Sequence, residues 1–129
     1  MQVLLIDDSA TSRLYTQQAL LQALPGIGIQ QVSSGRQAQD WLLLNNADLL
    51  ICDLEMEDGD GVELIHWLRQ QPAFRDLRVL VHSSHVDMLV KAVLHRYQPV
   101  AFLSKPATPA DLNAAVQTLW RGERHLTAA

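Results

Sequence analysis

Five short apolar runs, each followed by a longer stretch with helical spacing, constrain the fold of this chain more than any other feature. The runs occupy 2–6, 28–32, 48–53, 78–83 and 100–104. Apolar runs that alternate with helices favour right-handed crossovers and a parallel sheet covered on both faces. The sequence therefore predicts one α/β domain with five parallel strands. Gln30 and Gln31 interrupt the second run, so that strand is expected at an edge of the sheet.

Capping and stop residues predict where the helices begin and end. Ser9 can cap a first helix that runs from about Ala10 to Leu24, where Pro25-Gly26 stops it. The remaining helices are predicted at 34–46, 62–71, 86–96 and 108–121, with a polar tail after the last. The apolar side of the first helix is expected to carry Leu14, Leu20, Leu21 and Leu24.

Polar residues stand where four of the five strands should end. They are Asp7-Asp8, Asp53, Ser83-Ser84 and Lys105-Pro106. Because ligands of open parallel sheets bind outside the carboxyl ends of the strands, these side chains are expected to share one cleft. Two carboxylates about 4 Å apart repel by roughly 4 kcal/mol at an effective dielectric of about 20. The acids therefore need counterions, and Lys105 supplies one.

A hard dication is the natural second counterion. Magnesium fits best, with manganese as a substitute, since Mg²⁺ keeps several waters and takes one or two carboxylates together with phosphate oxygens. A nucleophilic carboxylate beside a magnesium ion and a lysine predicts a site that accepts a phosphoryl group. Ser83, Lys105 and the metal would each bind one phosphoryl oxygen, and Asp53 would be the nucleophile.

Together these motifs resemble the receiver domain of response regulators in two-component signalling, from Val3 to about Trp120. The resemblance rests on Asp7-Asp8, on Asp53 within Asp53-Leu54-Glu55-Met56, on Ser83 thirty residues later, and on Lys105-Pro106 a further twenty-two residues on. It implies a flavodoxin-like (βα)5 three-layer sandwich, with a five-stranded parallel sheet in the order 2-1-3-4-5.

The resemblance also implies a role for each residue of the site. Asp53 would accept a phosphoryl group from a histidine kinase or a histidine phosphotransfer domain. Asp8, Asp53 and the backbone carbonyl of Glu55 would hold Mg²⁺, and Asp7 would assist, directly or through water. Lys105 and Ser83 would contact the phosphoryl group, and Ser83 would act with Phe102 as a switch. Glu55 and His85 would tune the lifetime of the phosphoryl group.

In the family, the face made by helix 4, strand 5 and helix 5 usually carries the output. The resemblance therefore implies a signalling domain that controls an output domain or a downstream protein, with homodimer formation on activation as a further expectation. Such a domain catalyses only its own phosphorylation and dephosphorylation. We expect a receiver domain over 1–122 and a polar tail or linker start over 123–129, in a stand-alone regulator or an N-terminal receiver.

Composition argues against several other classes of protein. A net charge of −4 and the lack of a basic run argue against direct binding of nucleic acid. No apolar run approaches the length of a membrane span. The single cysteine, Cys52, fits a core position and a reducing compartment. A cytoplasmic location without membrane contact is expected. Glu57 and Asp58 are expected to lie in a solvated loop.

Simpler interpretations of the same residues stay open. Asp7-Asp8 could be a helix-capping acid pair, Lys105-Pro106 a strand-to-helix turn, and Ser83 a hydroxyl that satisfies a backbone group. His82 and His85 have no further zinc ligand close in sequence, so a zinc site is not favoured. Trp120 would either cover the core or contact a partner.

Three other kinds of function are compatible with an α/β fold. A flavodoxin-like cofactor binder would need a Ser/Thr/Gly-rich phosphate loop after the first strand, where the sequence has Asp7-Asp8-Ser9. A hydrolase or phosphotransferase of the haloacid dehalogenase type would need an Asp-x-Asp pattern at the same place. The third is a pseudo-receiver that is not phosphorylated and serves only in protein contacts.

Overall fold

The computed structural model describes residues 1–56 and 61–128, with side chains described as far as Arg121. Its single sheet has five parallel strands in the order β2-β1-β3-β4-β5. The predicted fold class, the strand order and the edge position of the second strand are thus confirmed. The strands are β1 (Gln2–Ile6), β2 (Gly28–Val32), β3 (Leu49–Cys52), β4 (Arg78–Ser83) and β5 (Val100–Ser104).

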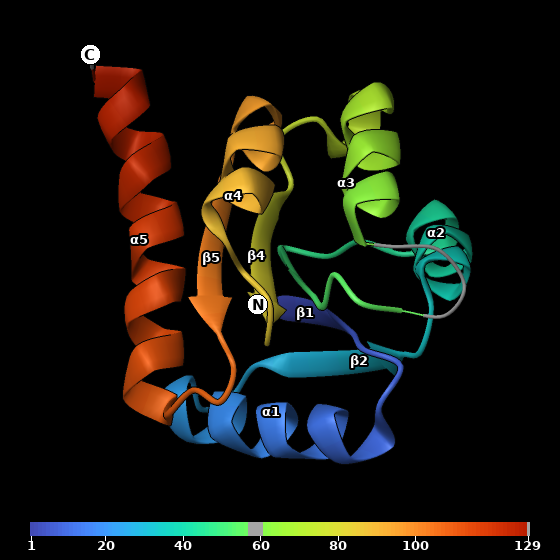
Figure 1. Ribbon diagram of the computed structural model, residues 1–129, viewed down its shortest axis with the longest axis vertical. Coiled ribbons are helices and arrows are strands. Elements are labelled where there is room, and N and C mark those ends of the chain that lie inside the picture. The colour runs from blue at the N-terminus through green and yellow to red at the C-terminus, as the bar shows by residue number, and fades with distance from the viewer. Residues whose placement is uncertain (57–60, 129) are drawn as a thin grey trace.

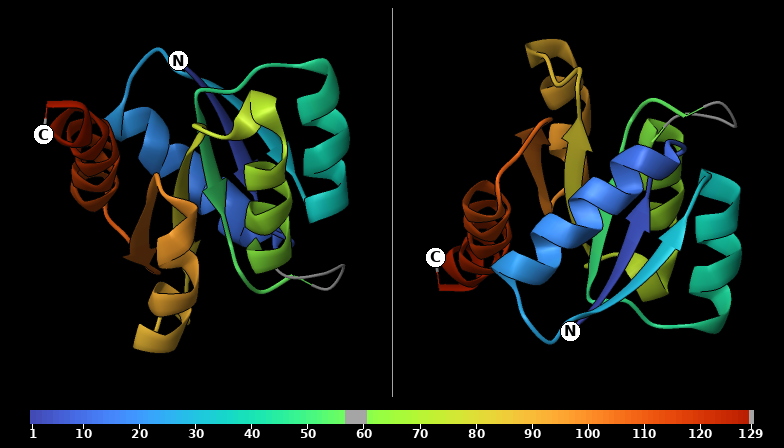
Figure 2. Two further views of the ribbon diagram at one scale, coloured as in Figure 1. Left: turned by 90° about the horizontal axis from the view of Figure 1, so that it is seen from above. Right: turned by 90° about the horizontal axis from the view of Figure 1, so that it is seen from below.

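Helices cover both faces of the sheet and make a three-layer sandwich (Figure 1). Helices α1 and α5 lie on one face, and α2, α3 and α4 lie on the other, as the views from above and below make plain (Figure 2). The helices are α1 (Ala10–Ala23), α2 (Gly35–Leu44), α3 (Gly61–Gln70), α4 (Met88–Leu94) and α5 (Pro109–Ala128), with short 3-10 helices at Pro72–Phe74 and His95–Tyr97.

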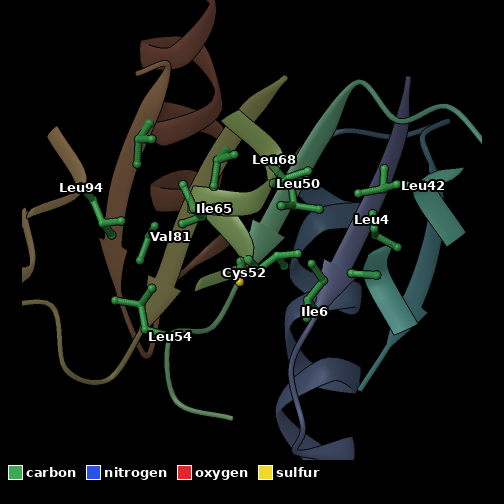
Figure 3. Close-up of a cluster of buried hydrophobic side chains, with 14 of the residues drawn as sticks. Leu4, Ile6, Leu42, Leu50, Cys52, Leu54, Ile65, Leu68, Val81 and Leu94 are labelled. Atoms are coloured by element: carbon green, nitrogen blue, oxygen red, sulfur yellow. The ribbon is translucent and has the colours of Figure 1, made fainter. Parts of the chain in front are cut away.

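Alternating side chains of the central strands enter two separate cores. In β3, Leu50 and Cys52 face α2, α3 and α4, whereas Leu49 and Ile51 face α1 and α5. Figure 3 shows the first of these cores, to which α3 contributes Ile65 and Leu68. Because β3 is apolar on both faces, its first polar side chain can appear only where the strand ends, and that side chain is Asp53.

Helix α1 buries a different face from the one predicted. Thr16, Ala19 and Leu20 are buried, whereas Leu14 and Leu21 are 53% and 43% exposed. At 3.6 residues per turn, positions 14 and 21 lie on the side of the helix opposite to 16, 19 and 20. The prediction was right for Leu20 and for Leu24, which packs against the core, and wrong for Leu14 and Leu21, which lie on the outer side of the helix.

The ends of three other elements also differ from the prediction. Helix α4 is shorter than 86–96, because Asp87 caps it at the start and the 3-10 helix His95–Tyr97 follows its end. Helix α5 continues to Ala128 rather than ending near Arg121, so most of the predicted tail at 123–129 is helical. Strand β3 is one residue shorter at each end. The predicted loop acids Glu57 and Asp58 lie outside the described residues.

Trp120 covers the edge of the core, which was one of the two positions predicted for it, the other being a contact with a partner. Its ring packs against the cluster formed by α1, α5 and the sheet, and the guanidinium of Arg78 lies 3.9 Å from the ring centroid. Cys52 is fully buried, as predicted. None of the helices in the described ranges is long and apolar enough to cross a membrane.

Candidate functional site

The carboxyl ends of β1, β3, β4 and β5 bring the predicted polar residues to one edge of the sheet. Backbone hydrogen bonds continue the pairing beyond the strands: the amide of Asp53 donates to the carbonyl of Ile6 at 3.0 Å, and the amide of Lys105 donates to that of Ser83 at 3.0 Å. These bonds fix where Asp53 and Lys105 leave the sheet. The sequence prediction that the strand ends converge is correct for Asp7, Asp53 and Lys105, whose side chains contact one another.

The ammonium group of Lys105 joins the two acids. Its Nζ atom donates to Oδ2 of Asp7 at 2.6 Å, to Oδ2 of Asp53 at 2.8 Å and to Oγ of Ser12 at 2.7 Å. An ammonium has three protons, so every donor of Lys105 has an acceptor within the protein. We call Asp7, Asp53, Lys105 and Ser12 the lysine cluster.

Burial and hydrogen bonding act in opposite directions on the charges of Asp7 and Lys105. Burial alone would raise the pKa of Asp7, but hydrogen bonds from Lys105, Ser12 and the amide of Ser9 outweigh it and lower the pKa. Burial alone would lower the pKa of Lys105, but its bonds to Asp53 and Asp7 outweigh it and raise the pKa. Both groups are therefore charged at neutral pH.

The backbone around Asp53 is tightly packed. Its Oδ1 atom accepts a hydrogen bond from the amide of Glu55 at 3.0 Å, which orients the carboxylate. Gly61, the first residue of α3, donates its amide to the carbonyl of Leu54 at 3.0 Å. A Cβ atom at position 61 would lie 2.7 Å from the carbonyl oxygen of Asp53, so only glycine allows α3 to begin this close to the end of β3.

Ser83 and Phe102, the predicted switch residues, lie on neighbouring strands. Ser83 is completely buried, and its hydroxyl has no hydrogen-bond partner among the described residues. A buried hydroxyl without a partner is costly, so a ligand oxygen at this strand end would satisfy it. Phe102 is half-buried against the core that faces α4, and the ammonium of Lys91 lies 5.9 Å from its ring centroid.

Glu55 and His85, the two residues predicted to tune the phosphoryl lifetime, contact each other. Nδ1 of His85 lies 2.6 Å from Oε1 of Glu55, and both side chains are largely exposed. Glu55 follows β3 and His85 follows β4, so the contact links two loops at the mouth of the site. The other histidine nearby, His82, is buried with Nδ1 2.9 Å from the carbonyl oxygen of Leu103, and burial lowers its pKa. The two histidines thus have separate partners.

The oxygen atoms at this edge suit magnesium by their chemistry. No three His, Cys, Asp or Glu side chains within the described ranges form a metal cage of their own. Mg²⁺ does not require one, since it keeps several waters and takes one or two carboxylates with substrate oxygens. Asp8 is exposed, Asp53 lies at the strand end, and both offer hard oxygen ligands of this kind. The predicted donors therefore fit a hydrated Mg²⁺ ion.

Two residues of the site were not anticipated from the sequence. Ser12 joins the lysine cluster from the first turn of α1, and Arg13 donates from Nη1 to the backbone carbonyl of Asp7 at 2.6 Å. Ser9 had been recognised only as a helix cap, yet its amide also donates to Oδ1 of Asp7 at 2.9 Å. The position of Ser12 three residues after the cap, and so on the same side of the first turn, is the signal that could have revealed it.

The parallel sheet in the order 2-1-3-4-5, with an Asp–Lys–Asp cluster at its carboxyl edge, defines the receiver class of signalling domain. A family model described as the response regulator receiver domain matches residues 3–117, and the chain belongs to this family. It therefore carries the receiver domain of a two-component response regulator. Receivers of this family interact with histidine kinases and output domains and generally bind Mg²⁺ at their acidic pocket.

Curated relatives extend beyond the region that this chain matches. The transcriptional activator protein ExaE of Pseudomonas putida is 32% identical over 127 residues, which are 98% of this chain and 58% of that protein. The response regulator UvrY of Escherichia coli K12 is 24% identical over 127 residues, 98% of this chain and 57% of that protein. The chain thus spans a little over half the length of these relatives.

Solved structures of receivers have the same fold. The chemotaxis protein CheY4 of Vibrio cholerae superimposes with a TM-score of 0.83 at 24% identity, over 92% of this chain and 97% of that one. The signal receiver domain of a signal transduction histidine kinase from Syntrophus aciditrophicus gives a TM-score of 0.80 at 28% identity, over 94% and 90% of the two chains. At 24% identity, the similarity to CheY4 shows only that the two chains share a fold.

Proposed function

We propose that this protein is a phosphoryl-accepting switch in which Asp53 takes a phosphoryl group from a histidine kinase or a histidine phosphotransfer domain. The observation that carries the proposal is the position of the Lys105 ammonium, within hydrogen-bonding distance of both Asp53 and Asp7. A cation held beside a strand-end carboxylate can neutralise charge on an incoming phosphoryl group. The domain responsible would be 1–122, acting in the cytoplasm.

In the transfer step, a carboxylate oxygen of Asp53 attacks the phosphorus of a phosphohistidine. The new O–P bond forms as the P–N bond breaks, and the leaving imidazole takes up a proton from water. Lys105 neutralises one equatorial oxygen, and the buried hydroxyl of Ser83 donates to another. These two groups reach the phosphoryl from β5 and β4, so the strands themselves fix their relative positions.

Asp8, Asp53 and the backbone carbonyl of Glu55 would hold Mg²⁺, with Asp7 assisting directly or through water and Mn²⁺ as a substitute. When bound, the ion would neutralise the remaining charge on the phosphoryl oxygens. The amide of Glu55 already donates to Oδ1 of Asp53, so this loop both orients the nucleophile and presents a carbonyl beside it.

Phosphorylation would act on the face formed by α4, β5 and α5. The hydroxyl of Ser83 would move toward the phosphoryl group, and Phe102 on the neighbouring strand would turn inward. Helix α4 already exposes Met88 and Leu89, an apolar surface that an output domain, a downstream protein or a second copy could cover. Glu55 and His85 would set how long the phosphoryl group survives.

Treatment with a small phosphodonor in the presence of Mg²⁺ tests the proposal. Intact-mass measurement should find one added phosphoryl group on the wild type and none on Asp53→Asn, with chelation of Mg²⁺ also preventing the addition. Asp40→Asn, on the exposed side of α2, is the control and should behave as the wild type. A wild type that gains no phosphoryl group would instead indicate a pseudo-receiver.

A further inference from the structure

We propose that Ser12 is a positioning residue that anchors the Lys105 ammonium and aims its remaining donor at Asp53. The role of Ser12 in phosphoryl transfer rests on the proposed function, but the hydrogen bond that anchors Lys105 can be tested without phosphorylation. Oγ of Ser12 accepts from Nζ of Lys105 at 2.7 Å, a distance between those of the two carboxylate contacts. A neutral hydroxyl thus holds the lysine as closely as the acids do.

Ser12 also donates to the carboxylate of Asp7, and this bond helps to lower the pKa of Asp7. The three groups therefore form a closed set, in which Lys105 donates to Ser12 and Asp7 while Ser12 donates to Asp7. Ser12 is held in place by the helix start, where its amide donates to Oγ of Ser9 at 3.2 Å. The anchor is consequently built into the first turn of α1, a rigid element outside the sheet.

The consequence for catalysis follows from the number of donors on Lys105. Two of its three protons are used on Asp7 and Ser12, so the third points to Asp53. When Asp53 becomes an acyl phosphate, its charge moves to the phosphoryl oxygens, and the third donor can follow that charge without releasing the other two. Without the hydroxyl, one donor would lack its acceptor and the flexible side chain would sample other positions.

Three substitutions at position 12 separate the hydroxyl from the shape of the side chain. Ser12→Ala removes the hydroxyl. Ser12→Thr and Ser12→Val have the same branched shape, but only threonine keeps a hydroxyl. Ser12 is only partly buried, so thermal unfolding should confirm that all three variants fold.

The first measurement uses the unphosphorylated protein. The sequence has only two lysines, Lys91 and Lys105, so ¹⁵N-lysine labelling gives two ammonium signals. The Lys105 protons should exchange slowly with water in the wild type and in Ser12→Thr, and faster in Ser12→Ala and Ser12→Val, while Lys91 on α4 serves as the internal control. Equal protection of Lys105 in the wild type and Ser12→Ala would overturn the inference, whether or not the protein is phosphorylated.

The second measurement is the rate at which a small phosphodonor modifies Asp53. Ser12→Ala and Ser12→Val should be slower than the wild type by about 3- to 10-fold, within the range expected for the net loss of one ordinary hydrogen bond, because Lys105 keeps its bonds to both carboxylates. Ser12→Thr should recover most of the rate. A wild-type rate in Ser12→Ala, or a threonine variant no faster than the valine variant, would contradict the proposed role. A wild type that accepts no phosphoryl group would instead count against the proposed function.

Discussion

Two pairs, each of a basic and an acidic side chain, lie at the same edge of the sheet with almost the same spacing, yet their surroundings differ. Lys105 lies 2.6 Å from Asp7, and His85 lies 2.6 Å from Glu55. The side chains of Lys105 and Asp7 are 16% and 3% exposed, whereas those of His85 and Glu55 are 74% and 58% exposed. Distance alone therefore does not distinguish a fixed pair from an adjustable one.

Burial decides what each pair can do. Water screens the exposed pair, so His85 and Glu55 can separate at little cost. The buried pair has lost most of its hydration, so each charge depends on its partner and on two added hydrogen bonds: Lys105 donates to Oγ of Ser12, and the amide of Ser9 donates to Asp7. The lysine cluster is suited to hold a fixed geometry, whereas the exposed pair can rearrange, as the proposed control of the phosphoryl lifetime would require.

The largest expected effect follows from removing the central cation. Lys105→Met leaves the carboxylates of Asp7 and Asp53 close together without their shared counterion. We expect the free energy of unfolding at pH 7 to fall by about 3–5 kcal/mol, the range for a buried pair that loses one partner. Urea denaturation measures it.

Lys91→Met is the matched control, because Lys91 is the other lysine of the chain and is exposed on α4. Its effect on unfolding should stay within about 0.5 kcal/mol. If the two lysine substitutions destabilise the protein equally, the buried contacts of Lys105 add no more to stability than an exposed lysine does.

A smaller effect should appear in the pH dependence of stability. Burial would raise the pKa of Asp7, but its hydrogen bonds outweigh burial and lower the pKa in the folded state. The stability from ionised Asp7 is therefore fully present above the ordinary carboxyl pKa of about 4, and it is lost as the pH falls below that value. The difference in stability between the wild type and Asp7→Asn should narrow when the pH is lowered from about 7 to about 3 in buffer that contains a chelator.

Asp40→Asn is the control for this titration, since Asp40 is exposed on α2. Its difference from the wild type should be small at each pH. If the difference in stability between the wild type and Asp7→Asn stays constant or widens in acid, the carboxylate of Asp7 is not stabilised by Lys105, Ser12 and Ser9 in the folded protein.

The sequence predicted the strands and the buried pair well for a physical reason. An apolar run that is buried on both faces, as in β1 and β3, leaves only one possible place for a carboxylate such as Asp7 or Asp53, the end of the strand. The strand order and the roles of Ser83 and Phe102 came instead from resemblance to the receiver family. The strand order is confirmed, whereas these roles stay predictions.

Helix faces and contacts between loops were harder to predict. The leucines of α1 suggested a core face that includes Leu14 and Leu21, but the helix packs through Thr16, Ala19 and Leu20. Ser12 joins Lys105, ninety-three positions further along the chain, only because folding brings the first turn of α1 within reach of the lysine side chain. The three-residue spacing from Ser9 indicates which side of the first turn Ser12 occupies, but the identity of its partner, Lys105, depends on how the elements pack.

The smallest expected effects concern the exposed pair. Glu55→Ala and His85→Ala should each change the rate of phosphoryl loss by about 1.5- to 5-fold, the range of energies measured for exposed ion pairs, with little change in stability. Because the side chains contact each other, the double variant should differ from the product of the two single effects. The decay of the phosphorylated protein, followed by intact mass, measures all three rates.

His95→Ala removes an exposed histidine from the other end of α4 and should leave the decay unchanged. If the double variant changes the decay rate by the product of the two single effects, the contact between Glu55 and His85 does not couple them. If neither single variant changes the decay rate, these residues do not control the phosphoryl lifetime.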